Sequence, residues 1–466
     1  MKLGTLPVKE LPPAKPLLKL LGPSFIILGL GLGSGELILW PYLTSLYGLG
    51  IIWGAIVGIT FQFFMNMEIE RYALAKGESI FVGFARKLAF LPIWFVLSTF
   101  IPWIWPGIAA SSAKILGSLF GITQTHYLAI VLLLLAGFIL TIGPVLYKTV
   151  ENLQKFLILL GVPIIFSITV YIVFVLNPDA VGALTKGMVG IGENYLFLPV
   201  GIPIATFLAA LAYAGAGGNL NLAQSNYIKE KGYGMGEHAG RITSMLTGKA
   251  ENISLEGADF EMNEKNLSTF NKWWKNINIE HFGIFWVTGV VTILMFALLA
   301  YVTLLHQGGT KSDISFIISE AHVISSIVSP FLGTFFLIIA GVMLFATQLT
   351  VLDATSRILS ENIVLALKDS EGRSISKIYY TVLWIQIVTG IAILSIGFAE
   401  PLQLVIIAAV LNAFAMFVHS GLTLWLNKTA LHKNIQPNML RAGVMLLAFL
   451  FYGGFSIYTI ITRLFY

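Results

Sequence analysis

Apolar runs of about 20 residues recur along almost the whole chain, and this feature constrains the fold more than any other. A helix of that length crosses a bilayer core of roughly 30 Å. Lipid offers no hydrogen-bond partner to the backbone, so spanning segments must be helices or closed barrels. The runs are continuously apolar and do not alternate with polar residues, which favours helices. The sequence therefore predicts an all-α membrane protein.

The composition excludes several other classes of protein. Charged residues make up 11% of the 466-residue chain, whereas soluble proteins carry roughly 25%. The absence of cysteine excludes disulfides, thiolate metal sites and cysteine nucleophiles. The net charge is +5, but the basic residues lie between apolar runs and form no single basic face. We therefore expect no nucleic-acid partner and a chain surrounded by the lipid bilayer.

Eleven segments are apolar and long enough to span a membrane as helices. Their approximate limits are 24–47, 51–75, 91–120, 127–147, 153–176, 196–216, 282–305, 327–349, 378–397, 402–426 and 442–461. With the tail 1–22 in the cytosol, most Lys and Arg residues fall in cytosolic segments, and chiefly Lys186 and Lys311 fall outside. This asymmetry satisfies the positive-inside rule. It predicts a plasma-membrane protein with a cytosolic N-terminus and an external C-terminus.

The first segment carries glycine at every second position, in Gly29-Leu-Gly-Leu-Gly-Ser-Gly-Glu36. Glycine costs a helix interior about 1 kcal/mol relative to Ala, so the run predicts unwound backbone at Gly33-Ser34-Gly35-Glu36. A packing seam of small residues is the alternative. Glu36 follows at membrane mid-depth, where a buried charge usually serves a function. We expect Glu36 to bind a cation or a proton, or to cap the second half-helix.

The sixth segment has the same character as the first. It reads Ala212-Tyr-Ala-Gly-Ala-Gly-Gly-Asn219, and further amides follow at Asn221 and Gln224. If the fold consists of two repeats of five helices, the first and sixth segments occupy equivalent positions. Paired glycine-interrupted helices in such positions indicate the central site of a secondary transporter. We therefore expect Ala216, Gly217, Gly218 and Asn219 to face the first segment across that site.

These motifs resemble the Nramp family of divalent-metal transporters, which share the LeuT-type fold. The resemblance runs from the first segment to the tenth. It rests on Gly22-Pro23 before the first helix, on Glu70-Arg71 through Gly77-Glu78 in the second, and on Leu424 through Leu431 in the tenth. It implies five-plus-five inverted repeats.

The resemblance, together with the polar stretch between segments six and seven, gives the expected domain organisation. We expect a core over 23–426 with repeats at about 23–177 and 194–426, and a long cytosolic loop at 229–281. The stretch 427–466 adds an extra C-terminal helix. Neither a nucleophile–base constellation nor a His/carboxylate metal cluster is evident in the sequence, so we expect a carrier without a cofactor and not an enzyme.

The chain departs from the family where the family binds its metal. The tetrapeptide Asp-Pro-Gly-Asn of the family corresponds to Gly33 through Glu36, and its Met-Pro-His corresponds to about Ala216-Gly217-Gly218. The missing thioether and imidazole argue against the usual manganese or iron selectivity. Oxygen ligands favour a hard ion such as Mg²⁺, with Mn²⁺ still open. Glu36 and Asn219 are the expected metal ligands, and Asn412 is a further candidate at the site.

Four more polar residues are candidates for coupling or gating. Glu68, about two turns inside the second segment, is either a proton relay or part of an interfacial ion network. Gln224 is expected to supply an amide oxygen or an interhelical hydrogen bond. Asp353 and Arg357, spaced i,i+4 at the cytosolic end of the eighth segment, form either an inner gate or a local helix pair.

Two transport functions remain open from the sequence. The first is alternating-access transport of a divalent cation, and the alternative is proton- or sodium-coupled transport of a small organic solute such as an amino acid or amine. The glycine-rich breaks leave space and backbone donors that can hold a carboxylate, which supports the alternative. A membrane enzyme and a pure channel are weaker readings, because the paired broken helices indicate a gated carrier.

Overall fold

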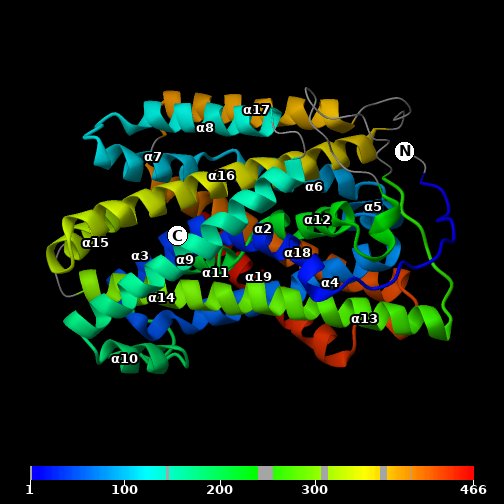
Figure 1. The fold of residues 1–466 in the computed structure, drawn as a ribbon, viewed down its shortest axis with the longest axis horizontal. Coiled ribbons are helices and arrows are strands. Elements are labelled where there is room, and N and C mark those ends of the chain that lie inside the picture. Colours follow the sequence, from blue (N-terminus) through cyan, green and yellow to red (C-terminus); the bar gives the residue numbers. More distant parts are fainter. Residues whose placement is uncertain are drawn as a thin grey trace.

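The structure is a computed structural model that describes residues 3–142, 146–239, 255–305, 313–367, 375–398 and 400–465. Within these ranges its regular secondary structure is helical, with two isolated β-bridges, and ten helices are long and apolar enough to cross a membrane (Figure 1). The chain is therefore an integral membrane protein. Lys311 and the stretch 240–254 of the expected long loop lie outside the described residues.

The ten spans correspond to ten of the eleven expected segments. Their bounds are Pro23–Tyr47 (α2, η1, α3), Leu49–Lys76 (η2, Leu49–Ile51, and α4, Trp53–Lys76), Leu91–Leu119 (α6, Leu91–Trp103, and α7, Gly107–Leu119), Thr125–Ile142 (α8), Tyr147–Leu176 (within α9, Leu146–Leu176), Glu264–Leu304 (α13, Glu264–His281, then η5, Phe282–Val287, and α14, Thr288–Leu304), Pro330–Ala366 (α16), Ile375–Ser395 (α17), Pro401–Ala430 (α18) and Met439–Ile461 (within α19, Met439–Phe465). The shorter elements are α1 (Leu17–Leu20), α5 (Ile80–Lys87), α10 (Ala180–Gly187), α11 (Ile204–Ala212), η3 (Gly218–Ala223), α12 (Gln224–Lys231), η4 (Gly234–His238), α15 (Phe316–Ile327) and η6 (Lys433–Ile435).

The remaining expected span, 196–216, is a broken helix. Its first half, α11, ends at Ala212, and η3 and α12 follow a non-helical stretch. Gly217 and Gly218 have φ angles of 77° and 56°, a region of backbone conformation that favours glycine. The clustered glycines therefore break this helix as predicted. The second half continues as the 3₁₀-helix η3 and the α-helix α12.

The first segment, in contrast, is not unwound as predicted. The α-helix α2 (Pro23–Gly31) passes directly into the π-helix η1 (Leu32–Leu39) and then into α3 (Trp40–Tyr47). The Trp40 N–H donates to the Gly35 carbonyl, five residues earlier, so the wider turn keeps its backbone hydrogen bond. The prediction was wrong because an intact π-helix satisfies backbone groups that unwinding would leave unpaired in a buried setting.

The glycines of the first segment form the packing seam that was the alternative explanation. A Cβ on Gly31 would lie 2.7 Å from the Gly215 carbonyl oxygen, and one on Gly33 would lie 2.5 Å from Thr347 Oγ1. Neither distance is tolerated by real side chains. Gly31 thus allows the break of the sixth segment to approach the first helix, and Gly33 allows α16 to approach it.

The last part of the expected loop 229–281 is also helical. The helix α13 begins after Asn263, whose side chain accepts a hydrogen bond from the Asn266 N–H as an N-cap. It continues without a gap into the seventh segment. Phe270, Trp273 and Ile277 are buried on one face, so burial of this apolar stripe stabilises the helix.

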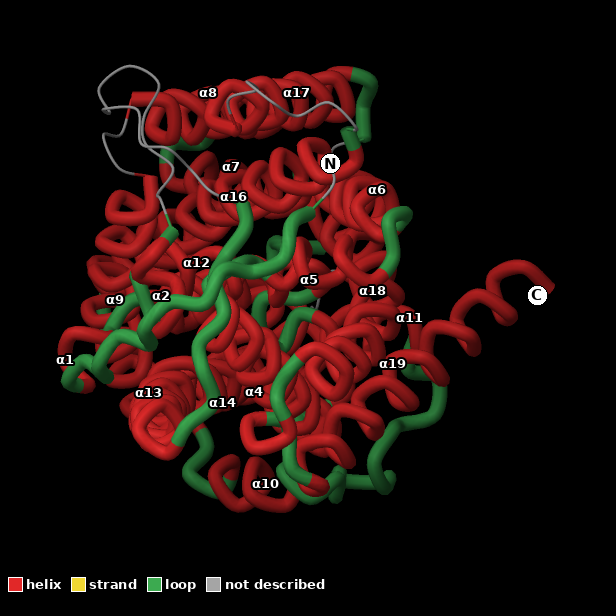
Figure 2. Tube along the Cα trace, turned by 90° about the vertical axis from the view of Figure 1, so that its right-hand side faces the viewer, coloured by secondary structure: helices red, strands yellow, loops and turns green. Residues whose placement is uncertain are grey.

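The first helix and the broken helix lie in the centre of the bundle. All residues of α2 and η1 are buried, and α16, which packs against η1, crosses almost the full length of the molecule in Figure 1. The pair α8 and α17 forms one edge, and α19 extends away from the bundle on another side (Figure 2). Exposed Val131, Leu135 and Phe138 give α8 an apolar outer face, as a lipid-facing helix requires.

The N-terminal tail and the start of α13 lie at one end of the bundle, on the right in Figure 1. We call this end the tail side. The short helices α10 and α15 lie at the opposite end. The prediction that the tail side faces the cytosol stays a prediction.

Candidate functional site

Glu36 lies on η1 with its side chain fully buried toward α14. The Thr292 hydroxyl of α14 donates a hydrogen bond to Glu36 Oε2. Within the described residues, Oε1 has no hydrogen-bond partner. A Cβ on Gly289 would lie 3.7 Å from that oxygen and also close to Leu28 and Ile59, so the surroundings are apolar. A carboxylate oxygen in such a place can hold a cation or a proton.

A glutamine from α4 forms hydrogen bonds with the backbone on both sides of the break in the sixth segment. Gln62 Nε2 donates to the Ala212 carbonyl at 3.0 Å, and Gln62 Oε1 accepts from the Gly217 N–H at 3.1 Å. One side chain thus satisfies a free carbonyl at the end of α11 and a free N–H beyond the break. The sequence analysis did not select Gln62, although an amide in an apolar helix is a signal of this kind.

Two residues of α18 also contact the break, one at each end. Asn412 Nδ2 donates to the Tyr213 hydroxyl at 3.0 Å, and His419 Nε2 lies 3.0 Å from the Gly218 carbonyl oxygen. A Cβ on Gly218 would collide with the Asn412 side chain. Asn412 therefore lies directly at the break, and its role at an ion site stays a prediction.

Asn219 turns toward α6. Its Nδ2 donates to Ser98 Oγ at 2.8 Å and to Thr99 Oγ1 at 2.9 Å. Nearby on the same helix, the Trp103 ring stacks on Tyr213, with 5.4 Å between the ring centroids. Asn219 Oδ1, Asn412 Oδ1 and Trp103 Nε1 are buried without a hydrogen-bond partner in the described part of the chain. The break thus presents unpaired donors and acceptors.

The structure divides the predicted site residues into two groups. Glu36 contacts α14, whereas Asn219 and Asn412 contact α6 and the break, and in the part of the chain that is described no hydrogen bond joins the two groups. The described residues contain no group of three or more His, Cys, Asp or Glu side chains arranged to hold a metal. The remaining predicted positions are all buried, on η1 or at the break; they are Gly33, Ser34, Gly35, Ala216, Gly217 and Gly218.

Glu68 belongs to an ion network near the tail side. It accepts hydrogen bonds from Arg71 Nε at 2.8 Å and from Asn427 Nδ2 at 3.1 Å, and Arg441 lies 3.4 Å away. The Arg71 guanidinium also lies 3.9 Å from the centre of a Trp274 ring. Glu68 is therefore held by two cations in the network that the sequence analysis named as its alternative role.

Asp353 and Arg357 join three helices, which is more than a local pair on α16. Arg357 Nε lies 2.9 Å from both Asp353 carboxylate oxygens, and the Tyr379 hydroxyl of α17 donates to Asp353 at 2.8 Å. Arg357 also donates to Glu230, which lies on α12 in the second half of the broken helix. The pair therefore links α12, α16 and α17, and its role as a gate stays a prediction.

The N-terminal tail covers the tail side. Lys15 Nζ donates to the Gly232 carbonyl at the end of α12 at 2.9 Å, and Trp273 of α13 donates to the Pro12 carbonyl at 2.8 Å. The Tyr233 hydroxyl donates to the Leu20 carbonyl. These contacts tie the tail to the end of α12 and to α13.

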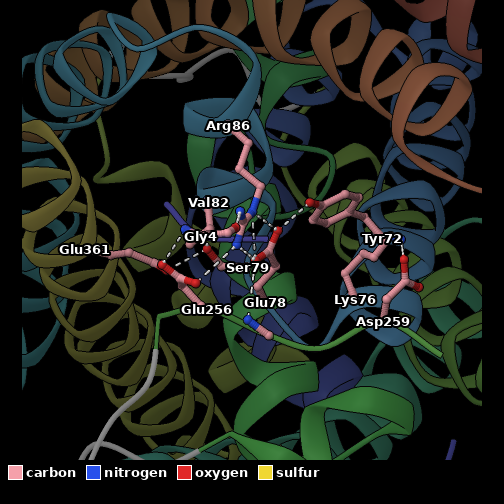
Figure 3. A network of polar contacts seen from close by, with 11 residues as sticks. Gly4, Tyr72, Lys76, Glu78, Ser79, Val82, Arg86, Glu256, Asp259 and Glu361 are labelled. Carbon is pink, nitrogen blue, oxygen red and sulfur yellow. Dashed lines mark hydrogen bonds and ion pairs between the residues drawn. The ribbon is translucent and has the colours of Figure 1, made fainter. Parts of the chain in front are cut away.

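The segment around Asp259 also contacts the tail, and its contacts with α4 and those of Glu78 are drawn in Figure 3. The Lys9 N–H donates to the Asp259 carbonyl at 2.8 Å, and Lys76 Nζ at the end of α4 contacts the Asp259 carboxylate at 2.6 Å. Beside them, Glu78 accepts from Arg86 and from the Tyr72 hydroxyl. The tail and the segment around Asp259 are thus anchored on the α4–α5 corner.

Gln224, the first residue of α12, donates from Nε2 to Glu70 Oε1 of α4 at 2.6 Å. It therefore makes an interhelical hydrogen bond with a buried carboxylate. Its Oε1 is buried and has no partner among the residues described. The amide links the second half of the broken helix to a further cluster of buried charges.

No family model matches the sequence, and no curated protein is similar to it in sequence. Similarity appears with solved structures. A manganese transporter of Eremococcus coleocola superimposes with a TM-score of 0.69 at 13% identity, with 98% of this chain and 90% of that chain covered. The transporter Mhp1 of the nucleobase-cation-symport-1 family gives 0.54 at 12% identity, covering 97% and 95%. The structure of MhsT in complex with L-phenylalanine gives 0.50 at 13% identity, covering 94% and 97%. The chain has the LeuT-type fold that these transporters share.

Proposed function

We propose that this protein is a secondary transporter that works by alternating access and carries a divalent cation, a hard ion such as Mg²⁺ or Mn²⁺. The LeuT-type fold supports the transport function, because a broken helix at the centre of that fold serves alternating access around a central site. A distant relationship to the Nramp family, without its usual metal-binding motifs, is part of this proposal.

The observation that carries the cation proposal is the unpaired oxygen of Glu36. This carboxylate is fully buried in the central helix, and within the described ranges its Oε1 has no protein partner. An ionised carboxylate in an apolar interior is costly unless a cation or a proton neutralises it. Thr292 supplies a neighbouring hydroxyl oxygen, a ligand type that suits Mg²⁺ and Mn²⁺.

Isothermal titration of the purified protein with Mg²⁺, Mn²⁺ and Ca²⁺ tests the proposal. We expect saturable binding by the wild type and loss of that binding in Glu36→Gln. The matched control is Glu320→Gln on α15, because Glu320 is also buried and its Oε1 lacks a partner within the described residues. Binding that survives Glu36→Gln, or that disappears equally in Glu320→Gln, contradicts a site at Glu36.

A second candidate function is the transport of a small organic solute such as an amino acid or amine. The observation that favours it is the mixture of unpaired groups at the break, with the Asn219 and Asn412 oxygens as acceptors and the Trp103 indole as a donor. An indole N–H repels a cation but suits a polar organic molecule. The stacked rings of Trp103 and Tyr213 add an apolar wall.

Thermal stabilisation by a panel of amino acids and amines tests this second function. A ligand that binds only the folded state raises the unfolding temperature. We expect stabilisation to be lost in Asn412→Ala and kept in Glu36→Gln if the break holds an organic solute. Stabilisation lost only in Glu36→Gln would contradict a solute site at the break and favour binding at Glu36.

A further inference from the structure

A second cluster of buried titratable groups lies toward the tail side, apart from Glu36. It consists of Glu70 on α4 and of Glu280 and His281 at the end of α13, where the seventh segment begins. Ser24 on α2 and Gln224 on α12 complete it. All five side chains are at most 3% exposed. Four helices therefore bring ionisable and hydrogen-bonding side chains together in one buried cluster.

The members of the cluster form one hydrogen-bonded chain. The Ser24 hydroxyl donates to Glu280 Oε2 and lies 2.7 Å from His281 Nδ1. His281 Nδ1 also lies 3.4 Å from Glu70 Oε1, the oxygen that accepts from Gln224. Because the Ser24 proton points to Glu280, the serine oxygen accepts from His281, which places a proton on Nδ1.

Two atoms of this chain are left without a partner in the described part of the protein, His281 Nε2 and Glu70 Oε2. The His281 ring is stacked between Phe63 and Phe285, with ring-centroid distances of 5.6 Å and 4.7 Å. The aromatic rings fix the imidazole plane and exclude other polar groups from its faces. The unpaired atoms are thus held in place by packing and remain free to take up a proton.

The charge of the cluster is not balanced by neighbouring cations. Lys231 and Arg441 are near enough to act on the cluster electrostatically, but Lys231 is paired with Glu151 at 2.7 Å and Arg441 with Glu68 at 3.4 Å. Among the other described titratable groups, Tyr147 and Tyr233 face Glu280, with Glu151 beside both tyrosines and Glu230 beside Tyr147. Glu70 and Glu280 are linked through His281 and Ser24, and two carboxylates this close in a low-dielectric interior repel each other unless a proton is bound.

We propose that Glu70, Glu280 and His281 form a proton-binding site that is separate from Glu36 and that couples the first helix to the second half of the broken helix. A proton passes along the chain without other bond changes. In one concerted shift, protonated Glu70 gives its proton to His281 Nδ1 while that nitrogen gives its own to Ser24 Oγ and Ser24 gives its own to Glu280 Oε2. Glu70 thus loses one proton and Glu280 gains one, whereas His281 and Ser24 end with as many protons as they had.

Two hydrogen bonds connect the charge state of this site to the first helix and to α12. Glu280 Oε1 accepts from the Gly22 N–H at 3.4 Å at the start of the first helix, and Glu70 accepts from Gln224 at the start of α12. A carboxylate accepts more strongly than a carboxylic acid. Proton uptake therefore weakens the hold on both elements. Its role in coupling rests on the proposed transport function, whereas proton binding itself does not.

Infrared difference spectroscopy of the purified protein between about pH 5 and pH 8 tests the site without any substrate. We expect a carboxylic-acid carbonyl band that titrates in the wild type. Each of Glu70→Gln and Glu280→Gln should remove part of this band, whereas Glu36→Gln should leave the cluster's part in place. A folded Glu70→Gln/Glu280→Gln double variant with the wild-type band would overturn the proposal.

Ser24→Ala keeps every titratable group and cuts the chain between Glu280 and His281. We expect it to shift the pH midpoint of the band, and an unshifted midpoint would overturn the proposal even if the Gln variants do not fold. The two failures are distinguishable. Loss of cation binding in the titration described above says nothing of this band, and loss of this band leaves the Glu36 site unaffected.

Discussion

Gly35 of the first helix packs directly against the backbone carbonyl of Tyr213 at the break of the sixth segment. A Cβ on Gly35 would collide with the carbonyl oxygen and carbon of Tyr213, and backbone atoms cannot turn away as a flexible side chain can. The two central elements therefore meet backbone to backbone. Any side chain at position 35 must push the break away from the helix.

The first prediction follows from this contact. Gly35→Ala should lower the free energy of unfolding by about 1–3 kcal/mol, the usual cost of overpacking, as measured by thermal unfolding in detergent. The control is Gly283→Ala in η5, where no described atom lies within 4 Å of the added methyl group. Alanine suits a helix better than glycine, so the control should be neutral or slightly stabilising. Equal losses in both variants would contradict the contact.

The second prediction concerns the hydrogen bond from Thr292 to Glu36. Thr292→Val should destabilise the protein by about 1–3 kcal/mol, because it leaves a buried carboxylate oxygen without its donor. Thr303→Val is the control, since the Thr303 hydroxyl on the same helix bonds only the Leu299 carbonyl of its own backbone among the described partners. In a Glu36→Ala background the cost of Thr292→Val should fall toward that of the control. An unchanged cost would mean that Thr292 does not act through Glu36.

The spans could be predicted from the sequence because bilayer thickness fixes the length of an apolar helix. The break at Gly217-Gly218 was also predictable, since both residues adopt positive φ angles that other residues avoid. The same reasoning failed at Gly33 and Gly35. Glycine there serves close helix packing, and a sequence does not say which neighbour approaches a glycine.

The candidate site was predictable only in part for a related physical reason. The presence of Glu36, Asn219 and Asn412 near the central helices follows from their positions on predicted spans. Their partners Thr292 and Ser98 come from other helices, and the rotation of those helices is set by packing alone. For that reason the sequence paired Glu36 with Asn219, whereas the structure gives each a separate partner.

The third prediction tests the buried ion group at the tail side. Arg357→Met should destabilise the protein by about 3–5 kcal/mol, because it leaves Asp353 and Glu230 buried without their shared cation. The measurement is thermal unfolding in detergent. Replacing all three, as Arg357→Met with Asp353→Leu and Glu230→Met, should recover most of the loss, because no uncompensated charge then remains. A triple variant as unstable as Arg357→Met would show that the cost is one of packing.

The last prediction concerns the anchor between Lys76 and Asp259. The chain has no cysteine, so a single Ala258→Cys provides a clean probe. Ala258 is fully buried, and its N–H donates to the Lys76 carbonyl at 2.9 Å, so a thiol there should react slowly. Lys76→Glu should raise its labelling rate up to about fivefold, because a partly exposed ion pair contributes at most about 1 kcal/mol. Adding Asp259→Lys restores opposite charges at the same two positions, so it should return the rate toward the original value. Rates that stay equal in all three proteins would mean that this ion pair does not hold the segment on α4.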